Sequence, residues 1–310
     1  GVIFCFVRRN VAHAARVLRP DVLHVNGLGF PFQTRALCAL DVPVLVQDHA
    51  DNPDSRARVL RRWGLAKIAG VAFTSDEQAR PFFENGTLNP RTPVFAIPES
   101  STRFRPGDVE AARRETGLYG KPVVLWVGHL DENKDPLTII DGFSRALDAI
   151  PDAHLWCCYL KAPLLEQVRA RLARDGRLAR HVHLLGAVAH DRVELLCRAA
   201  DFFVLGSHRE SCGFALLEAM ACGAVPIVSD IPAFRAITGN AATGALCTPG
   251  DAENFSRALT SFSCRSIDDL RARALSHFEA ELSFPFLGKK LAAAYQTILA
   301  NYAARGNDRA

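Results

Sequence analysis

Short apolar runs rich in valine, leucine and isoleucine alternate with longer amphipathic stretches along most of the chain. This alternation limits the fold more than any other feature. Runs of about four to six such residues have the length of buried strands, and the stretches between them show helical spacing. Strands that alternate with helices form parallel sheets whose faces are covered by the helices. The sequence therefore predicts an α/β protein built from βα units.

The predicted strands form two series. The first has strands at 22–25, 42–47, 70–74 and 94–97, with helical stretches at 33–40, 57–67 and 77–84. The second has strands at 123–127, 154–159, 182–185, 202–205, 225–228 and 245–247. Between the series, the segment Pro98–Gly107 is rich in turn residues and has the composition of a linker. A series of six strands with short crossovers is typical of a doubly wound sheet.

The length of 310 residues favours two domains, because single cores seldom exceed about 250 to 300 residues. We expect one Rossmann-like lobe over residues 1–106 and a second over 107–286. Residues 287–310 have amphipathic spacing and are expected to form a helix and tail that pack back on the first lobe. The chain begins at Gly1 inside an apolar run, and its first series has few strands. We therefore expect the start of the first lobe to be missing.

Composition argues against several classes of protein. The net charge is only +4, so no strongly basic surface for nucleic acid is expected. No apolar run approaches the ~20 residues that span a bilayer, and the opening run lacks the features of a signal peptide. The nine cysteines include no CxxC pair and lie mostly in apolar runs. We expect them to be buried thiols in a reducing compartment, and the protein to be cytoplasmic.

The segment from Ser207 to Gly223 is the most informative for function. It follows the predicted strand 202–205, and ligands of open α/β sheets bind beyond the carboxyl ends of strands. Gly213 permits close approach to the backbone, and a helix that starts at Phe214 would direct N–H groups and its positive dipole end at an anion. A diphosphate suits such a site. Glu218 lies in an apolar stretch, where an ionised group needs partners such as sugar or ribose hydroxyls.

Glu210 and Glu218, separated by seven residues and followed by Ala-Met-Ala-Cys-Gly, resemble the E-x7-E signature of the family-4 retaining glycosyltransferases. Residues 127–135 resemble the phosphate-binding turn of that family, and 186–188, 199–201 and 249–251 resemble its later landmarks in the right order. The resemblance covers about residues 20–302. It implies the GT-B fold, in which two Rossmann-like lobes face a cleft. It also implies transfer of a sugar from a nucleoside-diphosphate sugar to a hydroxyl acceptor, with no cofactor and no metal.

The resemblance implies roles for single residues. Lys134 would neutralise the donor diphosphate, Glu210 would bind hydroxyls of the transferred sugar, and Glu218 would hold the ribose. His49 would face the donor sugar, with Asp48 orienting its ring. We take His49, Glu210 and Lys134 as the catalytic residues. The predicted substrate-binding residues are Gly128, His129, Lys134, Val188, Glu210, Cys212, Gly213, Phe214, Ala215, Leu216 and Glu218, of which Cys212 is expected to fill space rather than to act as a nucleophile.

Three features depart from the family pattern. His129 stands where the family usually has an arginine, and a histidine is only partly charged near neutral pH. The segment 159–163 replaces a glycine-rich turn of the donor pocket. No segment before Pro20 matches the glycine-rich loop of the first lobe.

Other readings remain open. A nucleotide-sugar-binding protein without catalysis, or another GT-B enzyme such as a sugar-nucleotide epimerase, would share much of the sequence. Arg56, Arg58, Arg61 and Arg62 form a basic helical patch with Trp63. We expect a solvated helix face there rather than peripheral contact with an anionic inner membrane face. The sequence identifies neither the donor sugar nor the hydroxyl acceptor.

Overall fold

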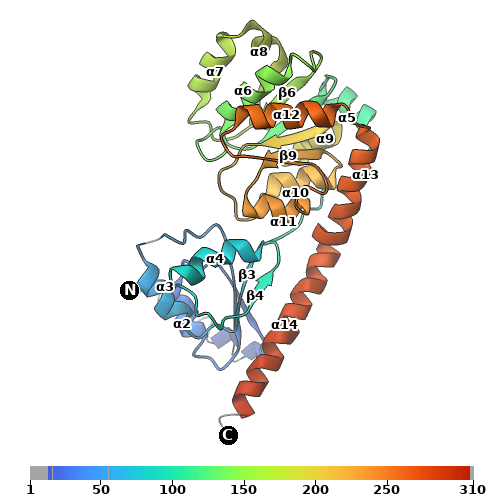
Figure 1. Cartoon of the computed structure of the whole chain (residues 1–310). Coiled ribbons are helices and arrows are strands. Elements are labelled where there is room, and N and C mark those ends of the chain that lie inside the picture. The colour runs from blue at the N-terminus through green and yellow to red at the C-terminus, as the bar shows by residue number, and fades with distance from the viewer. Residues whose placement is uncertain (1–12, 16, 55, 308–310) are drawn as a thin grey trace. The chain divides into compact units, whose positions relative to one another are not determined.

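The computed structural model describes residues 13–307 except 16 and 55. They form two compact units, each with its own parallel sheet (Figure 1). Unit 1 comprises Gly1–Glu99 and Leu287–Ala310, and unit 2 comprises Ser100–Phe286. The two parallel sheets confirm the predicted α/β class. Each of the ten predicted strands overlaps an observed strand, with bounds that differ by at most two residues.

The sheet of unit 1 has the strand order β1–β2–β3–β4 and is parallel throughout. Its strands are β1 (Leu23–Asn26), β2 (Val44–Gln47), β3 (Gly70–Phe73) and β4 (Val94–Ala96). The helices between them are α2 (Pro31–Leu37), α3 (Arg58–Leu65) and α4 (Asp76–Glu84). The central strands β2 and β3 are buried at every position, which explains their unbroken apolar sequence.

The C-terminal helix α14 (Phe284–Asn307) packs on the sheet of unit 1. Ile298 is fully buried in a cluster with Leu45 and Ala72. The Tyr295 hydroxyl lies 2.8 Å from Nδ1 of His24, so the apolar contact is joined by a hydrogen bond. The amphipathic spacing of residues 287–302 thus corresponds to one continuous helix that buries an apolar stripe.

Unit 2 has a six-stranded parallel sheet in the order β10–β9–β8–β5–β6–β7. Its strands are β5 (Val123–Val127), β6 (His154–Cys158), β7 (Val182–Gly186), β8 (Phe202–Leu205), β9 (Val225–Ser229) and β10 (Ala245–Cys247). The helices are α5 (Val109–Thr116), α6 (Pro136–Ala146), α7 (Leu165–Ala173), α8 (Gly176–His181), α9 (His190–Ala199), α10 (Phe214–Ala221), α11 (Pro232–Thr238), α12 (Ala252–Ser263) and α13 (Ile267–His277), followed by the π-helical turn η1 (Phe278–Leu282).

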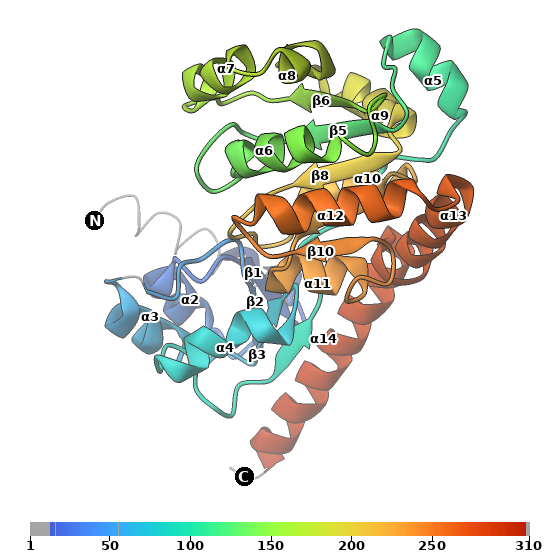
Figure 2. The same ribbon diagram turned by 45° about the horizontal axis from the view of Figure 1, so that its top comes forward.

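Helices cover both faces of this sheet. Helices α6 and α12 pack together on one face, and α9 and α10 on the other (Figure 2). The core between them contains fully buried aromatic side chains, among them Trp126, Phe143 and Phe234. The order of the strands places β5 between β8 and β6, so the chain reverses its direction of winding beside β5. This reversal is where doubly wound sheets bind ligands.

The cysteines follow the prediction only in part. Cys157, Cys158, Cys197, Cys212, Cys222 and Cys247 are buried, whereas Cys38 is half-buried and Cys264 is exposed. The expectation was wrong for Cys264 because this residue caps the C-terminus of α12 in a turn. Cys5 lies outside the described residues.

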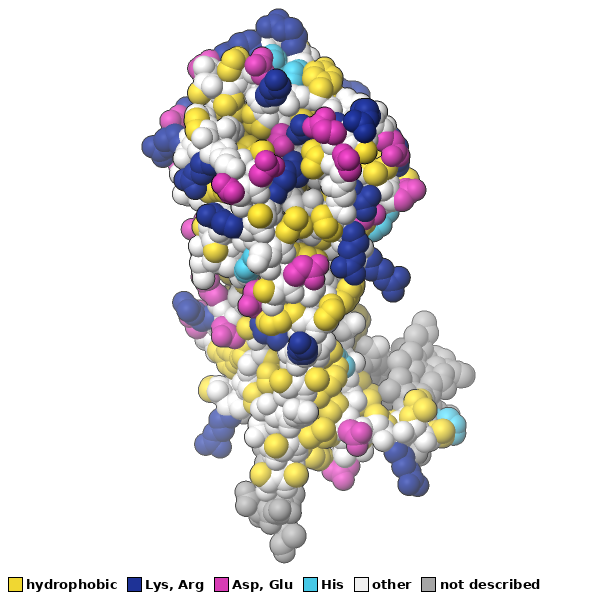
Figure 3. Space-filling view, turned by 90° about the vertical axis from the view of Figure 1, so that its right-hand side faces the viewer, with side chains coloured by type: hydrophobic (Ala, Val, Ile, Leu, Met, Phe, Trp, Pro, Cys, Tyr) yellow, Lys and Arg dark blue, Asp and Glu magenta, His cyan; other side chains and the backbone are white. Residues whose placement is uncertain are grey.

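Charges of both signs are interspersed on the surface. On the face of unit 2 seen in Figure 3, lysine and arginine side chains lie among aspartate and glutamate side chains. None of the helices described within residues 13–307 is long and apolar enough to cross a membrane.

Candidate functional site

A pocket of about 440 Å³ opens at the carboxyl ends of three strands of unit 2. Val127, Cys158 and Leu205 are the last residues of β5, β6 and β8, and all three line it. The pocket therefore lies beside the reversal of winding at β5, as the general rule for open α/β sheets requires.

Most of the predicted binding residues meet in this pocket. Those that line it are Gly128, His129, Lys134, Val188, Glu210, Gly213, Phe214, Ala215 and Glu218. The structure places the side chains of Cys212 and Leu216 elsewhere, fully buried in the core of unit 2. They follow Ser211 and Ala215 in the chain but face inward, where apolar burial favours them.

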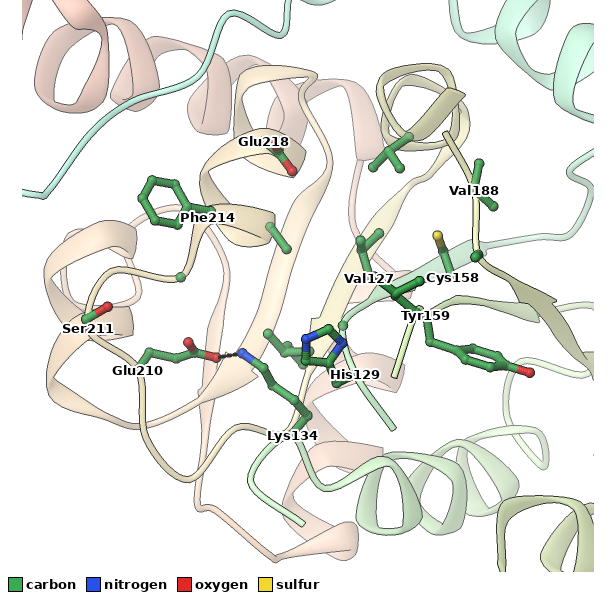
Figure 4. Close-up of a pocket in the computed structure, with 17 residues that line it drawn as sticks. Val127, His129, Lys134, Cys158, Tyr159, Val188, Glu210, Ser211, Phe214 and Glu218 are labelled. Atoms are coloured by element: carbon green, nitrogen blue, oxygen red, sulfur yellow. Dashed lines mark hydrogen bonds and ion pairs between the residues drawn. The ribbon is translucent and has the colours of Figure 1, made fainter. Parts of the chain in front are cut away.

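Lys134 and Glu210 form an ion pair on one side of the pocket (Figure 4). The Lys134 ammonium contacts Oε1 of Glu210, and the same oxygen accepts a hydrogen bond from the Ser207 hydroxyl at 2.7 Å. The side chains of Lys134 and Glu210 are only 20% and 12% exposed. A partly buried cation and anion are thus held next to each other where a ligand would enter.

Two loops are tied together to hold this pair. In the loop after β8, the His208 backbone N–H donates a hydrogen bond to the carbonyl of Asn133 at 2.8 Å. The side-chain amide of Asn133 donates one to the carbonyl of Arg209 at 3.0 Å. The Lys134 N–H donates to a carboxylate oxygen of Asp131 at 2.9 Å, which fixes the turn that carries Lys134. These hydrogen bonds bring residues 76 positions apart in sequence together at the pocket.

Helix α10 begins at the pocket. Its N-cap Gly213 has φ of 84°, a left-handed conformation that favours glycine. The N–H groups of Phe214 and Ala215 are in the first turn, where a helix offers no backbone acceptor for them, and both residues line the pocket. Together with the helix dipole, these donors make the pocket favourable for an anion.

Glu218 lies farther along α10 and is held by a histidine that belongs to none of the sequence motifs. Oε1 of Glu218 lies 2.8 Å from Nε2 of His190, the first residue of α9. The His190 ring is tilted against Phe104, with 4.9 Å between ring centroids. Glu218 is 17% exposed, so His190 supplies the partner that a carboxylate in an apolar stretch needs.

His129 and Tyr159 occupy the side of the pocket formed by β5 and β6. The His129 ring lies beside the Lys134 side chain (Figure 4). Its Nδ1 accepts a long hydrogen bond of 3.4 Å from the backbone N–H of Lys161. An acceptor at Nδ1 implies a proton on Nε2, so the neutral ring presents a donor on its other side.

Unit 1 places His49 two residues after the end of β2, and its ring partner differs from the expected one. Nδ1 of His49 lies 2.8 Å from Oε2 of Glu99, which follows β4. Asp48 does not orient the ring: its carboxylate accepts a hydrogen bond from the Asp51 N–H at 3.1 Å. Burial, followed by the nearby charges of Asp51 and Glu99, raises the pKa of Asp48 to about 6. The prediction was wrong here because Asp48 and His49 lie in the loop beyond β2, where the Asp48 carboxylate closes a turn with the Asp51 N–H and Glu99 meets the ring instead.

The basic patch on α3 is smaller than predicted. Arg61 is buried and bonds to a carboxylate oxygen of Asp51 at 3.0 Å and to the carbonyl of Asn52 at 2.6 Å. Arg58, Arg62 and Trp63 are exposed. Helical spacing turns Arg61 toward the loop after β2, so only its neighbours face solvent.

Comparison with known proteins assigns the family. Residues 108–274 match the family described as Glycosyl transferases group 1, and this range contains every residue of the pocket. The chain belongs to the group 1 glycosyltransferases. D-inositol 3-phosphate glycosyltransferases from Rhodococcus erythropolis and Geodermatophilus obscurus are 28% identical over 88% of the chain and 33% identical over 67% of it. These matches span 64% and 49% of the two relatives.

Solved structures of similar fold agree with this assignment. Anabaena Alr3699/HepE in complex with UDP has a TM-score of 0.77 at 17% identity and covers 94% of this chain and 82% of its own. A glycosyltransferase from Rickettsia africae has a TM-score of 0.79 at 15% identity, with coverage of 97% and 82%. The family and the two parallel sheets together confirm the expected GT-B fold.

Three site residues of this group 1 glycosyltransferase were missed from the sequence. Ser207, His190 and Glu99 each touch a predicted residue, but no motif links them to it. A signal was available only for Ser207, which is the first residue of the segment 207–223 and lies three residues before Glu210. Within the described residues, no group of three or more His, Cys, Asp or Glu side chains is arranged to hold a metal ion.

Proposed function

We propose that this chain transfers a sugar from a nucleoside-diphosphate sugar to a hydroxyl acceptor, with retention of configuration. One observation carries the proposal: Lys134, Glu210, Glu218 and the start of α10 meet in one pocket of a group 1 glycosyltransferase. Retention is a property of the family. UDP is a reasonable first nucleotide to test, since Anabaena Alr3699/HepE was solved with it.

The pocket offers a partner for each part of such a donor. The diphosphate would lie against the first turn of α10, with its charge balanced by Lys134. The free oxygen of Glu218 would accept a hydrogen bond from the ribose while His190 holds the other oxygen. Glu210 would bind hydroxyls of the sugar. Fixed charges and dipoles aimed at the leaving diphosphate stabilise it as its negative charge develops in the transition state.

Nucleotide binding tests the pocket directly. UDP, GDP and ADP, and their glucose and mannose derivatives, would be titrated against the chain by calorimetry and thermal shift. We expect at least one nucleoside diphosphate to bind, and to stabilise the chain by an amount that grows with the logarithm of its concentration once this exceeds the Kd. Lys134→Ala and Glu218→Ala should each weaken binding by about tenfold or more, as expected for loss of a charged hydrogen bond. Glu253→Gln, at an exposed pair with Arg145 far along the chain, is the matched control.

Binding and turnover separate the remaining alternatives. Release of nucleoside diphosphate together with a new glycoside of the same anomeric configuration as the donor establishes the transferase. Tight binding with no turnover on a panel of hydroxyl acceptors supports the nucleotide-sugar-binding alternative, and an epimerised sugar nucleotide supports the epimerase. Unchanged nucleotide binding in both Lys134→Ala and Glu218→Ala would remove the basis of the proposal.

A further inference from the structure

Unit 1 holds an acid–histidine pair at the carboxyl edge of its sheet. His49 follows β2 and Glu99 follows β4, and β3 lies between these two strands. The contact between Nδ1 of His49 and Oε2 of Glu99 is 2.8 Å. The Glu99 side chain is 4% exposed, whereas that of His49 is 45% exposed. The acid is thus inside the protein, and the ring that it binds reaches solvent.

The loop that carries His49 is held from several sides. Asp48 accepts a hydrogen bond from the Asp51 N–H, and Asp51 in turn accepts from the Leu28 N–H at 2.6 Å. Arg61 pairs with the other oxygen of Asp51. Asp51 and Arg61 are about 10% exposed, so this ion pair is shielded from water. A loop tied by a shielded pair and several backbone hydrogen bonds presents His49 in a defined position.

The contact between Glu99 and His49 lies among other charged side chains. Asp48 and Asp51 are acids, and the buried guanidinium of Arg61 is engaged with Asp51 and Asn52. An ionised carboxylate accepts hydrogen bonds and cannot donate one. With Glu99 ionised, the proton between the two side chains belongs to Nδ1 of His49. In the neutral ring, Nε2 then carries a lone pair.

We propose that Glu99 is a positioning residue for His49, which it holds through Nδ1 so that Nε2 accepts a hydrogen bond from a substrate hydroxyl. Among the described residues, the His49 ring has no second hydrogen bond, which leaves Nε2 for a ligand. Without Glu99, the ring would be free to carry its proton on Nε2 and would then offer a donor instead of an acceptor. This assignment rests on the proposed sugar transfer for the identity of the hydroxyl, but not for the protonation of the ring.

The protonation of His49 is measured without any substrate. Long-range ¹H–¹⁵N spectra of the labelled chain distinguish the two neutral forms of a histidine, and His49→Asn identifies the signal. We expect the wild-type ring to carry its proton on Nδ1. Glu99→Ala should populate the form with the proton on Nε2, while Glu99→Gln, which keeps an acceptor oxygen, should retain more of the Nδ1–H form. Glu253→Gln is the control that removes an exposed carboxylate elsewhere.

Kinetics then separate positioning from a structural role. Glu99→Ala should lower kcat for sugar-nucleotide turnover by about tenfold or more, with the donor KM changed less than about threefold, as expected for a residue that acts on the reacting geometry. Glu99→Gln should recover part of kcat, and both variants should keep the melting temperature within a few degrees. A wild-type His49 that carries its proton on Nε2 overturns the proposal whether or not the chain is active. An Nδ1–H ring in an active enzyme whose kcat is unaffected by Glu99→Ala overturns it as well. A wild-type chain without turnover would count against the proposed function, and the ring protonation would still decide the role of Glu99.

Discussion

Gly213→Ala should destabilise unit 2 and weaken nucleotide binding together. At φ of 84° an alanine costs about 1 kcal/mol or more relative to glycine. The new Cβ would also lie 2.6 Å from Cε1 of Phe234, a ring that is fully buried. Relief of that overlap requires movement of the ring or of the start of α10, which adds about 1–3 kcal/mol. We expect a total of about 2–4 kcal/mol, and displacement of the Phe214 and Ala215 N–H groups from the phosphate position.

Gly117→Ala is the matched control for this variant. Gly117 has φ of 74°, but a Cβ there meets nothing within 4 Å, so only the backbone penalty of about 1 kcal/mol applies. Urea unfolding in a Trp63→Phe background would be followed by the fluorescence of Trp126 and Trp156, which both belong to unit 2. A Gly213→Ala variant that is no less stable than Gly117→Ala, or that binds nucleotide normally, would refute the reasoning.

Three further predictions follow from the site and from the edge of the sheet. His129→Arg should tighten nucleoside-diphosphate binding by up to about tenfold, since arginine adds a permanent positive charge beside Lys134; calorimetry at a fixed pH measures this. His190→Ala should reduce the preference for a ribonucleotide over its dideoxy analogue by about threefold or more, because Glu218 loses the hydrogen bond that holds it; an unchanged preference would contradict this role. Burial, followed by the charges of His154 and His181, lowers the pKa of His183 to about 4. The unfolded chain therefore binds more protons than the folded one between about pH 6.5 and 4, and stability falls as the pH drops through this range. His183→Phe, which keeps a ring against Trp156, should recover about 1 kcal/mol of the unfolding free energy lost between pH 7 and 5, and an equal loss in both proteins would show that His183 is not responsible.

The sequence was sufficient for the strands and for most of the residues that line the pocket of unit 2, because these depend on local patterns. The runs that became β5 and β8 are apolar throughout, and Glu210 and Glu218 are joined by one turn and one helix. Contacts between distant segments could not be predicted in this way. Glu99 reaches His49 across β3, and this depends on the order and register of strands separated by about 50 residues. The burial of Arg61 likewise depends on the path of the loop after β2, which local spacing does not determine.

If the donor binds as proposed, the Lys134–Glu210 pair would couple recognition of the diphosphate to recognition of the sugar. Without ligand, Lys134 and Glu210 neutralise each other in a partly buried position. In the proposed complex a bound diphosphate would compete with Glu210 for Lys134, and the hydroxyls of a donor sugar would replace the ammonium as hydrogen-bond donors to the Glu210 carboxylate. A nucleoside diphosphate without a sugar would not supply these hydroxyls.

Glu210→Gln should therefore separate the two steps. The variant lacks the anion that competes for Lys134, so UDP, taken as the test nucleotide, should bind at least as tightly as to the wild type, while the extra affinity gained from the attached sugar should fall by about tenfold. Lys134→Ala should weaken both ligands alike. Calorimetry of UDP and UDP-glucose against the two variants measures the difference. If Glu210→Gln weakened UDP as much as Lys134→Ala does, the pair would be a structural support for the pocket, and the competition between Glu210 and the diphosphate for Lys134 would not exist.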